Sequence, residues 1–451
     1  MFHRRTFLKS AGAAGLAALI APLDVASATP AATEAAAAEA AAGPKPFVVS
    51  PELSKRMYEK ALTIAKTKIR GGEKEPFFKK PYLDEAFSPD IFYWDTCFMT
   101  CYAKYHQQEL PIAQALDNFY RVEDADGYIG RQYTENGIPF WEKNQPVSIN
   151  PPLLAFAELE LHSQQPNVER LRRVYEPLKR HFEYLQKTYR GEDGLYFGDT
   201  LGMGMDNVPR YPPGWKDDGK GLPAKHLYPE LFQYNGLDAK WNIQGRLVDL
   251  SAQMAFFALN LKRIAQLTDH AADVPAHEQA HAALKAAINK HCWSEADGFY
   301  FDLGYGKPIR RFHVGMYWAL LAECVPADRL DRFIAPLTDP KKFGRPVPVP
   351  SMAADEPEYR GYGAYWQGGV WAPTTYMVLR GLKLVGKAEL ARILAQRFYG
   401  AVAEVFEHTG TLWENYAPEF ASYGHPAKPD FCGWTAIVPI SIWREFIKTK
   451  A

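Results

Sequence analysis

Two acidic residues, Asp206 and Glu414, stand in segments whose neighbours suit acid and base chemistry. Asp206 belongs to Gly202–Trp215, a stretch of glycines, prolines and aromatic residues that cannot continue a helix and is predicted to be a loop. Apolar and aromatic neighbours strip water from a carboxyl group, and this raises its pKa toward the range that a general acid needs at neutral pH. An aspartate in such a loop can equally form an Asx turn with its own backbone, so the loop alone does not decide its role.

Glu414 lies in a second segment of this kind, Gly410–Glu419, between Trp413 and Tyr416. Hydrolysis of a glycosidic bond uses two such groups, one carboxylic acid and one carboxylate on either side of the scissile bond. Glu419 is a competing base, but it follows a proline outside the aromatic pair. The two acids in their aromatic loops are therefore the candidate catalytic pair.

Around these acids the sequence resembles the glycoside hydrolases of families 37 and 63, which include trehalases, processing glucosidases and mannosylglycerate hydrolases. The resemblance rests on Gly-Met-Asp-Asn-x-x-Arg at 204–210, Glu-Asn-Tyr at 414–416 and Tyr-Trp-Gln-Gly-Gly-Val-Trp-Ala-Pro at 365–373. It is closest to the bacterial family 63 type. The resemblance implies an inverting α-glycoside hydrolase in which Asp206 is the general acid and Glu414 the general base.

The same resemblance implies a set of substrate-binding residues. The Trp94–Asp95 pair is expected to bind the innermost sugar, although an acid at a helix start also suits a simple helix cap. Trp141 is either a stacking platform for a sugar or a loop anchor, and Trp434 of a Gly-Trp-Thr motif suits the core as well as the site. The implied substrate-binding residues are Trp94, Asp95, Trp141, Arg210, Tyr365, Trp366, Gln367, Trp371 and Trp434.

Departures from the family pattern bear on the substrate. Gln367 takes the place of a family arginine, so the cation that would hold an acidic aglycone such as glycerate is missing unless Arg360 or Arg210 replaces it. Asn150 takes the place of a glutamine in a Gln-Pro-Pro step, and its hydrogen bond is left open. The Pro-Gly-Gly-Arg-Phe motif of trehalases is replaced at 85–90. We therefore expect a small α-glucoside or related α-linked sugar as substrate, with trehalase and glucosyl- or mannosylglycerate hydrolase as alternatives.

The elements that must position these residues are helices. Apolar residues at every third or fourth position of 247–264 predict a helix with one buried stripe, and no alternating run is long enough for a substantial sheet. The predicted helices cover residues 51–69, 95–106, 110–121, 151–163, 166–189, 246–268, 274–291, 312–324, 327–336, 372–385, 387–406 and 433–447.

Turns of one type recur between these helices, at Asp126-Gly127, Asp193-Gly194 and Asp297-Gly298, with a looser copy at Thr409-Gly410. Recurring helix pairs with similar turns indicate a repeated unit that buries a common core. We expect an all-α fold, an (α/α)6 toroid (barrel) of about twelve helices with its catalytic loops at one mouth. A plain helical array with unrelated turns is the alternative.

The N-terminus predicts export. Residues 1–28 combine a twin arginine, an apolar run and an Ala-Ser-Ala site, which is typical of a twin-arginine signal peptide. Residues 29–46 form a low-complexity Ala/Glu tether, and 47–451 form the catalytic domain. The expected location is the periplasm, with the Tat export machinery as partner and no membrane contact after signal cleavage.

The amino-acid composition excludes some classes of binding partner. Lysine plus arginine and aspartate plus glutamate number 52 each, so no charged field would attract nucleic acid or an acidic membrane. The five cysteines lack zinc-binding spacing, and neither a metal nor another cofactor is predicted. A non-catalytic sugar-binding protein on the same toroid is the alternative of another class. An epimerase or lyase would rely on histidine, tyrosine or lysine pairs, and none stands out.

Overall fold

The computed structural model describes residues 47–72, 77–78, 80–83, 89–211, 245–304, 307–431 and 433–448. The predicted signal peptide and tether lie outside these ranges. So do Trp215 of the Asp206 loop and Cys432. The other four cysteines are buried free thiols.

The described chain is predominantly helical. Its helices are α2 (Pro51–Thr67), α3 (Tyr93–Ala103), α4 (Ile112–Arg121), α5 (Leu154–Gln164), α6 (Val168–Tyr189), α9 (Val248–Leu267), α10 (Val274–His291), α11 (Trp318–Leu321), α12 (Ala327–Ile334), α13 (Ala372–Leu384), α14 (Ala388–Thr409) and the π-helix η7 (Val438–Ile447). Short 3-10 helices are η1 (Lys104–His106), η2 (Pro146–Ser148), η4 (Ala271–Asp273), η5 (Val314–Tyr317) and η6 (Ala335–Leu337).

Each predicted helical stretch contains a helix, and the predicted all-α character is confirmed at this level. Two stretches are shorter than predicted for local reasons. His313 forms an extended bridge with Met352, so the helix predicted from 312 begins only at η5. The helix predicted from 433 begins at Val438, because the preceding turn is tied to a loop by the Thr435 hydroxyl, which donates to the Trp413 carbonyl.

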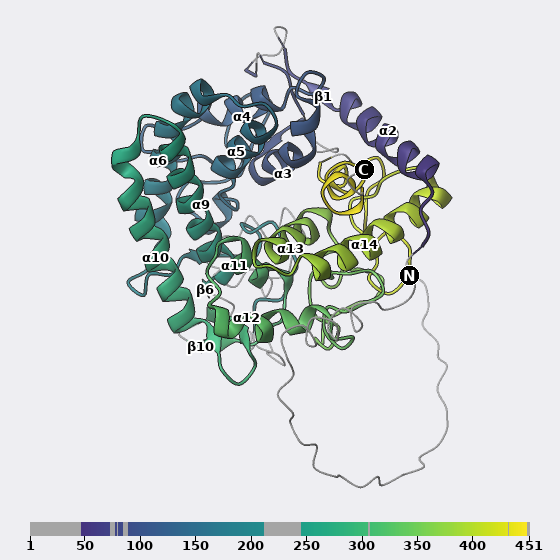
Figure 1. The fold of residues 1–451 in the computed structure, drawn as a ribbon. Helices are drawn as coiled ribbons and strands as arrows, with labels where there is room; N and C mark the ends of the chain where they lie inside the picture. Colours follow the sequence, from purple (N-terminus) through teal and green to yellow (C-terminus); the bar gives the residue numbers. More distant parts are fainter. Residues whose placement is uncertain are drawn as a thin grey trace, which may run out of the picture.

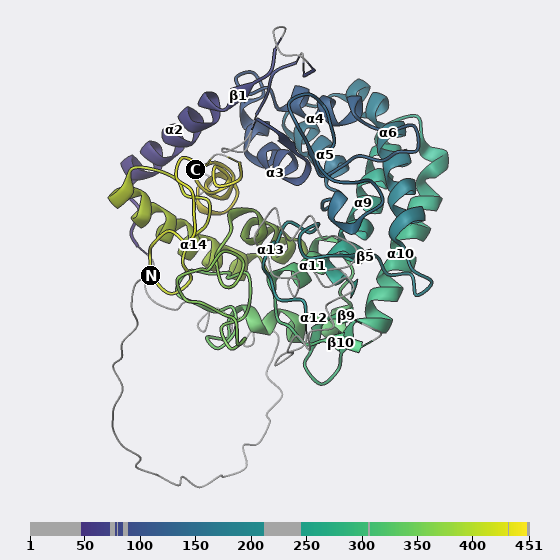
Figure 2. The same ribbon diagram turned by 180° about the vertical axis from the view of Figure 1, so that it is seen from behind.

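Six helices contact one another in a closed cycle. The order is α3, α5, α9, α11, α13, η7 and back to α3. The remaining helices pack outside them, with α4 on α3, α6 and α10 on α9, α14 on α13 and η7, and α2 on η7. Figures 1 and 2 show this arrangement from its two sides, with α6, α10 and α14 at the periphery. One continuous hydrophobic core runs through both layers.

Inner and outer helices differ in burial. On the outer helix α6, buried residues such as Leu171, Val174, Leu178 and Leu185 recur every three to four positions or their multiples, as expected of an amphipathic helix. The predicted single stripe of α9 is wrong, because every residue from Val248 to Leu261 is buried. The cause is tertiary: α9 is surrounded by α5, α6, α10 and α11.

Strands are short and belong to the loops. They are β1 (Ile69–Arg70), β2 (Tyr82–Leu83), β3 (Ile91–Phe92), β4 (Gln132–Tyr133), β5 (Phe197–Gly198), β6 (Gly245–Arg246), β7 (Trp293–Ser294), β8 (Phe299–Tyr300), β9 (Asp302–Gly304) and β10 (Lys307–Ile309). The pairs β1–β2, β3–β4 and β7–β8 and the four-stranded order β10-β9-β6-β5 are all antiparallel. Pairing of β3 with β4 sets the residues before α3 beside residues 132–133.

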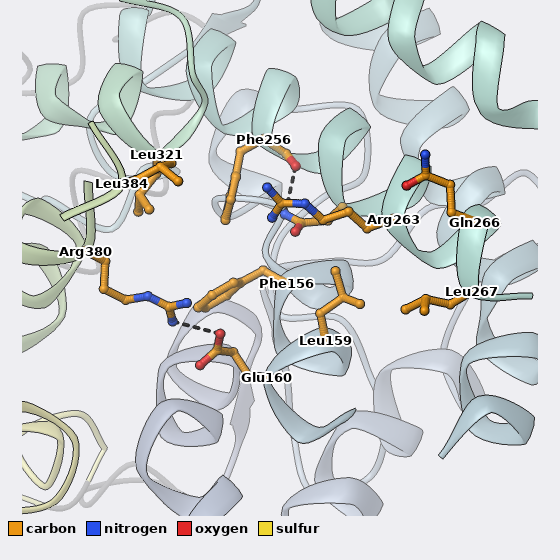
Figure 3. Close-up of a pocket in the computed structure, with 11 residues that line it drawn as sticks. Phe156, Leu159, Glu160, Phe256, Arg263, Gln266, Leu267, Leu321, Arg380 and Leu384 are labelled. Carbon is orange, nitrogen blue, oxygen red and sulfur yellow. Dashed lines mark hydrogen bonds and ion pairs between the residues drawn. The ribbon is translucent and has the colours of Figure 1, made fainter. Parts of the chain in front are cut away.

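A buried ion cluster lies just past the C-terminal end of α3. Lys104 Nζ lies 2.6 Å from Glu160 Oε2 and 3.0 Å from Glu445 Oε1, and Arg380 Nη1 lies 2.8 Å from Glu160 Oε1. A pocket of ≈ 410 Å³ opens beside Glu160 and Arg380, walled by Phe156 and by residues of α9 (Figure 3). Two cations, Lys104 and Arg380, thus face two acids, Glu160 and Glu445, and the charges of the cluster neutralise one another.

No helix in the described part of the chain is both long and apolar enough to span a membrane.

Candidate active site

A cavity of ≈ 480 Å³ brings Asp206 and Glu414 together from segments roughly two hundred residues apart in the sequence. Its walls come from the start of α3 and from loops around residues 131, 141, 204, 365, 414 and 427. The lining residues are Asp90, Phe92, Trp94, Asp95, Arg131, Gln132, Phe140, Trp141, Leu201, Gly204, Asp206, Tyr365, Glu414, Pro426, Ala427, Lys428 and Trp434.

The Asp206 segment is a pair of tight turns. Gly204 N donates to the Leu201 carbonyl at 3.0 Å, and Val208 N donates to the Met205 carbonyl at 2.9 Å. Gly204 has a φ of +70°, and a Cβ there would lie 2.4 Å from the Trp94 ring. Glycine is therefore required at this position both for its backbone conformation and for the close contact with the indole.

Asn207 connects the acid loop to the loop that faces Glu414. Its side chain donates to the Ala364 carbonyl at 3.0 Å and accepts from Trp366 N at 2.8 Å. The residue between Ala364 and Trp366 is Tyr365, whose Oη donates to Glu414 Oε1 at 3.1 Å. One asparagine thus couples the positions of both candidate catalytic acids.

Glu414 is held from three sides. Its other carboxylate oxygen accepts from Lys428 N at 3.2 Å, its backbone N donates to the Lys428 carbonyl at 2.9 Å, and its carbonyl accepts from Trp434 Nε1 at 3.0 Å. Glu419, the competing base, is bound instead by Arg345 and Tyr359, with Arg345 Nη2 2.5 Å from its carboxylate. Its pKa is lowered, because these partners outweigh its partial burial. This pairing favours Glu414 as the reactive acid.

The cavity acids carry raised pKa values. Burial raises the pKa of Asp206 to about 6 and that of Glu414 to about 7. Tyr365 and Lys428 donate to the charged form of Glu414 and partly oppose this rise. Burial also raises the pKa of Asp95 to about 7, against the opposing charge of Arg131 and with added repulsion from Asp206 and Glu414. The three carboxyl groups therefore interact electrostatically within one cavity.

Five of the nine predicted substrate-binding residues line this cavity: Trp94, Asp95, Trp141, Tyr365 and Trp434. Trp141 Nε1 donates to Gln132 Oε1 at 3.2 Å, so this tryptophan is a loop anchor as well as a cavity wall. Asp95 is the third residue of α3, whose N-cap residue makes no side-chain cap bond. Its carboxyl group lies against the cavity.

Trp366 and Trp371 form a layer behind the cavity wall. Their rings stack at 4.0 Å with an interplanar angle of 3°, and both are buried. Trp366 packs 6.1 Å from Trp94, and Trp371 packs 5.6 Å from Trp434. Gln367 does not line the cavity either. The structure therefore places Trp366 and Trp371 behind the cavity wall, and Gln367 outside the cavity lining.

Arg210 requires a correction. Its fully buried guanidinium binds Asp249 and Asp302, which places it in an internal ion network away from the cavity. Arg210 is 1% exposed and does not line the cavity, so the structure gives it a structural partner set in place of a substrate contact. Arg360, the other proposed replacement for the missing cation, binds the Pro357 and Tyr359 carbonyls.

Comparisons with known proteins show the family to which the chain belongs. The model of the family described as "Mannosylglycerate hydrolase MGH1-like glycoside hydrolase domain" matches residues 88–431. The chain belongs to this glycoside hydrolase family. A family 63 mannosylglycerate hydrolase of Thermus thermophilus, solved in complex with glucose, superposes with a TM-score of 0.68 and 20% identity over 86% of this chain and 100% of that one.

Curated relatives of this glycoside hydrolase include trehalases. The periplasmic trehalase of Pseudomonas aeruginosa is 23% identical over 366 residues, which cover 72% of this chain and 63% of the trehalase. An uncharacterized protein of Borreliella burgdorferi is 24% identical over 80% of this chain and 71% of its own length. The neutral trehalase of Saccharomyces cerevisiae superposes with a TM-score of 0.58 and 12% identity over 85% of this chain and 79% of that one. The chain thus spans less than two thirds of the bacterial trehalase that it matches.

Sequence reasoning missed two cations of this glycosidase. Arg131 lies over the Trp141 ring at 5.3 Å and donates to the Leu201 carbonyl at 2.6 Å. Lys428 lines the cavity beside Glu414. Arg131 lies four residues after the Asp126-Gly127 turn. Its position just after one of the recurring turns was the only sequence feature that could have indicated a role in the site.

Asn150, the departure from the family glutamine, keeps a hydrogen bond to the acid loop: its Nδ2 donates to the Gly202 carbonyl at 2.8 Å. Within the described ranges, no group of three or more histidine, cysteine, aspartate or glutamate residues is arranged to hold a metal ion.

Proposed function

We propose that this glycosidase is an exported, inverting α-glycoside hydrolase acting on a small α-glucoside or a related α-linked sugar. The observation that carries the proposal is the shared cavity of Asp206 and Glu414. Glu414 is buried and Asp206 is half-buried, both carry raised pKa values, and indole and phenol rings line the cavity around them. Aromatic faces with a few convergent polar groups suit a pyranose ring. The cycle of inner helices supports the (α/α)6 toroid with its catalytic loops at one mouth.

In the proposed mechanism, Asp206 protonates the glycosidic oxygen as general acid. Glu414 removes a proton from a water molecule that attacks the anomeric carbon from the opposite face. The Tyr365 hydroxyl and the Lys428 amide orient the Glu414 carboxylate and favour its charged form. The Asp95 carboxylate accepts hydrogen bonds from hydroxyl groups of the innermost sugar, while Trp94 and Trp434 lie against the faces of the sugar ring.

This mechanism requires protonated Asp206 and ionised Glu414 at the same time. Activity then falls at acid pH as Glu414 takes up a proton and at alkaline pH as Asp206 loses one. The pKa of Asp206 is about 6 and that of Glu414 about 7, so the required form is the minor one of the two singly protonated forms. Its population still peaks midway between the two values, and kcat/KM should follow a bell-shaped curve with a maximum at about pH 6.5. The two apparent values belong to the interacting pair.

The test combines stereochemistry with two isosteric variants. Asp206→Asn and Glu414→Gln should each lower kcat by on the order of 10²–10⁴, the range for a lost acid or base, with the melting temperature unchanged. Asp206→Asn should keep most of its rate on a dinitrophenyl α-glycoside, whose leaving group needs no proton. The first anomer released, followed by NMR, should be β. Release of the α anomer, or full activity of Glu414→Gln, would show that the single-displacement assignment is wrong.

A glucosyl- or mannosylglycerate hydrolase is the second candidate, and one observation favours it. Lys428 and Arg131 line the cavity and supply positive charge for an acidic aglycone, which Gln367 cannot. Comparing kcat/KM for glycosylglycerates and for neutral α-linked disaccharides, trehalose included, distinguishes the candidates. Binding of these sugars without turnover would instead indicate a sugar-binding protein.

We further propose export through the twin-arginine pathway into the periplasm, as residues 1–28 predict. The name of the Pseudomonas aeruginosa trehalase, a periplasmic protein, is consistent with this location. Replacing Arg4 and Arg5 with lysine should retain the protein in the cytoplasm. Undiminished recovery of that variant from the periplasm would contradict the proposal.

A further inference from the structure

The turn that carries Asp206 is clamped by three buried side chains from different parts of the chain. Arg131 Nη1 donates to the Leu201 carbonyl at 2.6 Å, and Asn150 Nδ2 donates to the Gly202 carbonyl at 2.8 Å. Asp199 Oδ1 accepts from Gly202 N at 2.5 Å, and its own carbonyl accepts from Met203 N at 3.2 Å. Asp199 is thus the only one of the three that bonds an amide hydrogen of the turn with its side chain.

Asp199 is an unusual residue to bury for structural reasons alone. It is 0% exposed, and its second carboxylate oxygen has no hydrogen-bond partner among the described residues. A buried carboxylate oxygen without a partner is costly, and one uncharged acceptor would be enough to hold the Gly202 amide. The retained negative charge therefore calls for a role beyond holding the turn.

We propose that Asp199 is a positioning residue for the general acid: its carboxylate holds the Leu201–Gly202 turn, and its negative charge keeps the catalytic proton on Asp206. The proposal rests on the assignment of Asp206 as the acid. It adds a residue that touches neither the substrate nor the cavity surface.

The charges around this pair support the proposed direction. Burial raises the pKa of Asp206, the Arg131 guanidinium lowers it, and the Asp199 charge raises it again. Asp199 itself faces Arg131 and Arg210, and burial raises its pKa to about 6 despite them. Asp95, Glu414 and Tyr365 face Asp206 across the cavity. Within this set, Arg131 and Asp199 shift the pKa of Asp206 in opposite directions.

Asp199 is ionised, and therefore effective, only above about pH 6. Removing its charge should lower the pKa of Asp206 and deplete the protonated acid at alkaline pH. At pH 5 both the native Asp199 carboxyl and its amide replacement are uncharged, so the two enzymes should behave alike.

The test is the pH profile of Asp199→Asn, which keeps an oxygen for the Gly202 amide and removes the charge. For an alkyl α-glycoside, kcat/KM should fall about 3- to 10-fold at pH 8, which corresponds to a shift of about 0.5–1 unit in the pKa of Asp206. At pH 5 it should stay within about twofold of wild type. With a dinitrophenyl α-glycoside, which needs no proton from Asp206, the loss at pH 8 should disappear.

Glu158→Gln is the matched control. Glu158 is a fully buried acid on α5 that pairs with Arg170 outside the cavity, so its replacement perturbs packing without changing the charge at Asp206. It should leave the shape of the pH profile unchanged. If Asp199→Asn does not fold, Asp199→Ser provides the same comparison with a smaller uncharged acceptor.

An Asp199→Asn enzyme with wild-type kcat/KM at pH 8, or with an equal loss at both pH values and on both substrates, would overturn the proposal. A different result, full activity of Asp206→Asn on the alkyl glycoside, would contradict the proposed function itself. An inactive Asp206→Asn together with an unchanged Asp199→Asn profile would refute only the role of Asp199.

Discussion

The two ends of helix α3 carry buried acids in opposite electrostatic states. At its start, Asp95 shares the cavity with Asp206 and Glu414, and burial raises the pKa of all three. At its end, Lys104 joins Glu160, Arg380 and Glu445. Burial alone would raise the pKa of Glu160, but Arg380 and Lys104 outweigh it and the net shift is downward. Nine positions along the helix, about 14 Å from Asp95 to Lys104, separate a cluster of incompletely neutralised acids from a neutralised one.

The difference lies in the partners and not in the depth of burial. The far cluster pairs each acid with a cation, and Figure 3 shows the Arg380 guanidinium directed at Glu160. Arg131, which lines the cavity, faces the carboxyl groups of Asp206, Asp199 and Asp95 at once. Buried acids that lack full neutralisation destabilise a fold, and proteins retain them where chemistry needs a group that can hold or release a proton. We infer that the far cluster contributes to stability and, under the proposed function, that the cavity acids take part in catalysis.

Breaking the far cluster should greatly lower the stability of the fold. Lys104→Met leaves Glu160 and Glu445 with one fewer cation, and removing one partner of a buried pair costs about 3–5 kcal/mol. The free energy of unfolding, measured by urea denaturation, should fall by that amount. The kcat/KM measured well below the melting temperature should stay close to wild type. A variant of unchanged stability but reduced kcat/KM would abolish the distinction between the two ends.

Two tryptophans sharpen the comparison within the catalytic end. Trp366→Ala removes a buried ring stacked on Trp371 and should cost about 3–5 kcal/mol of stability. Trp141→Ala removes a half-buried cavity wall and should mainly raise KM, with a smaller loss of stability. Urea denaturation and initial rates on one α-glycoside measure both effects. If Trp366→Ala raised KM at unchanged stability, its assignment to the supporting layer would be wrong.

The smallest expected effect is a pH dependence of stability that originates in the cavity. The folded-state pKa of Asp95 is about 7, above its ordinary value of about 4, so its contribution to stability is fully present below about pH 4 and is lost as pH rises through 7. The change in the free energy of unfolding caused by Asp95→Asn should therefore be more favourable at pH 8 than at pH 5, by on the order of 1–2 kcal/mol. Thermal denaturation at the two pH values tests this. An equal effect of the substitution at both would show that Asp95 is fully neutralised.

Local patterns in the sequence predicted most of the helices and both acid loops. Spacing of apolar residues places 274–291 and 372–384 in helices, because helix periodicity depends on neighbours within a few residues. The predicted Asp-Gly turns are present, and Gly127, Gly194 and Gly298 all have positive φ. Asp206 and Glu414 were identifiable from their glycine, proline and aromatic neighbours and from the family resemblance.

Only the tertiary structure decided which side chains face the cavity. The sequence could not distinguish Trp94, which lines it, from Trp366, which lies behind it, since both occur in aromatic motifs. It could not show that Arg210 is bound by Asp249 and Asp302, or that Asp199 lies behind the acid. The physical reason is that helix formation depends on local hydrogen bonds and periodicity. The cavity is built from loops whose hydrogen bonds and ion pairs join residues tens to hundreds of positions apart, and the electrostatic environment of each acid exists only once those loops are packed together.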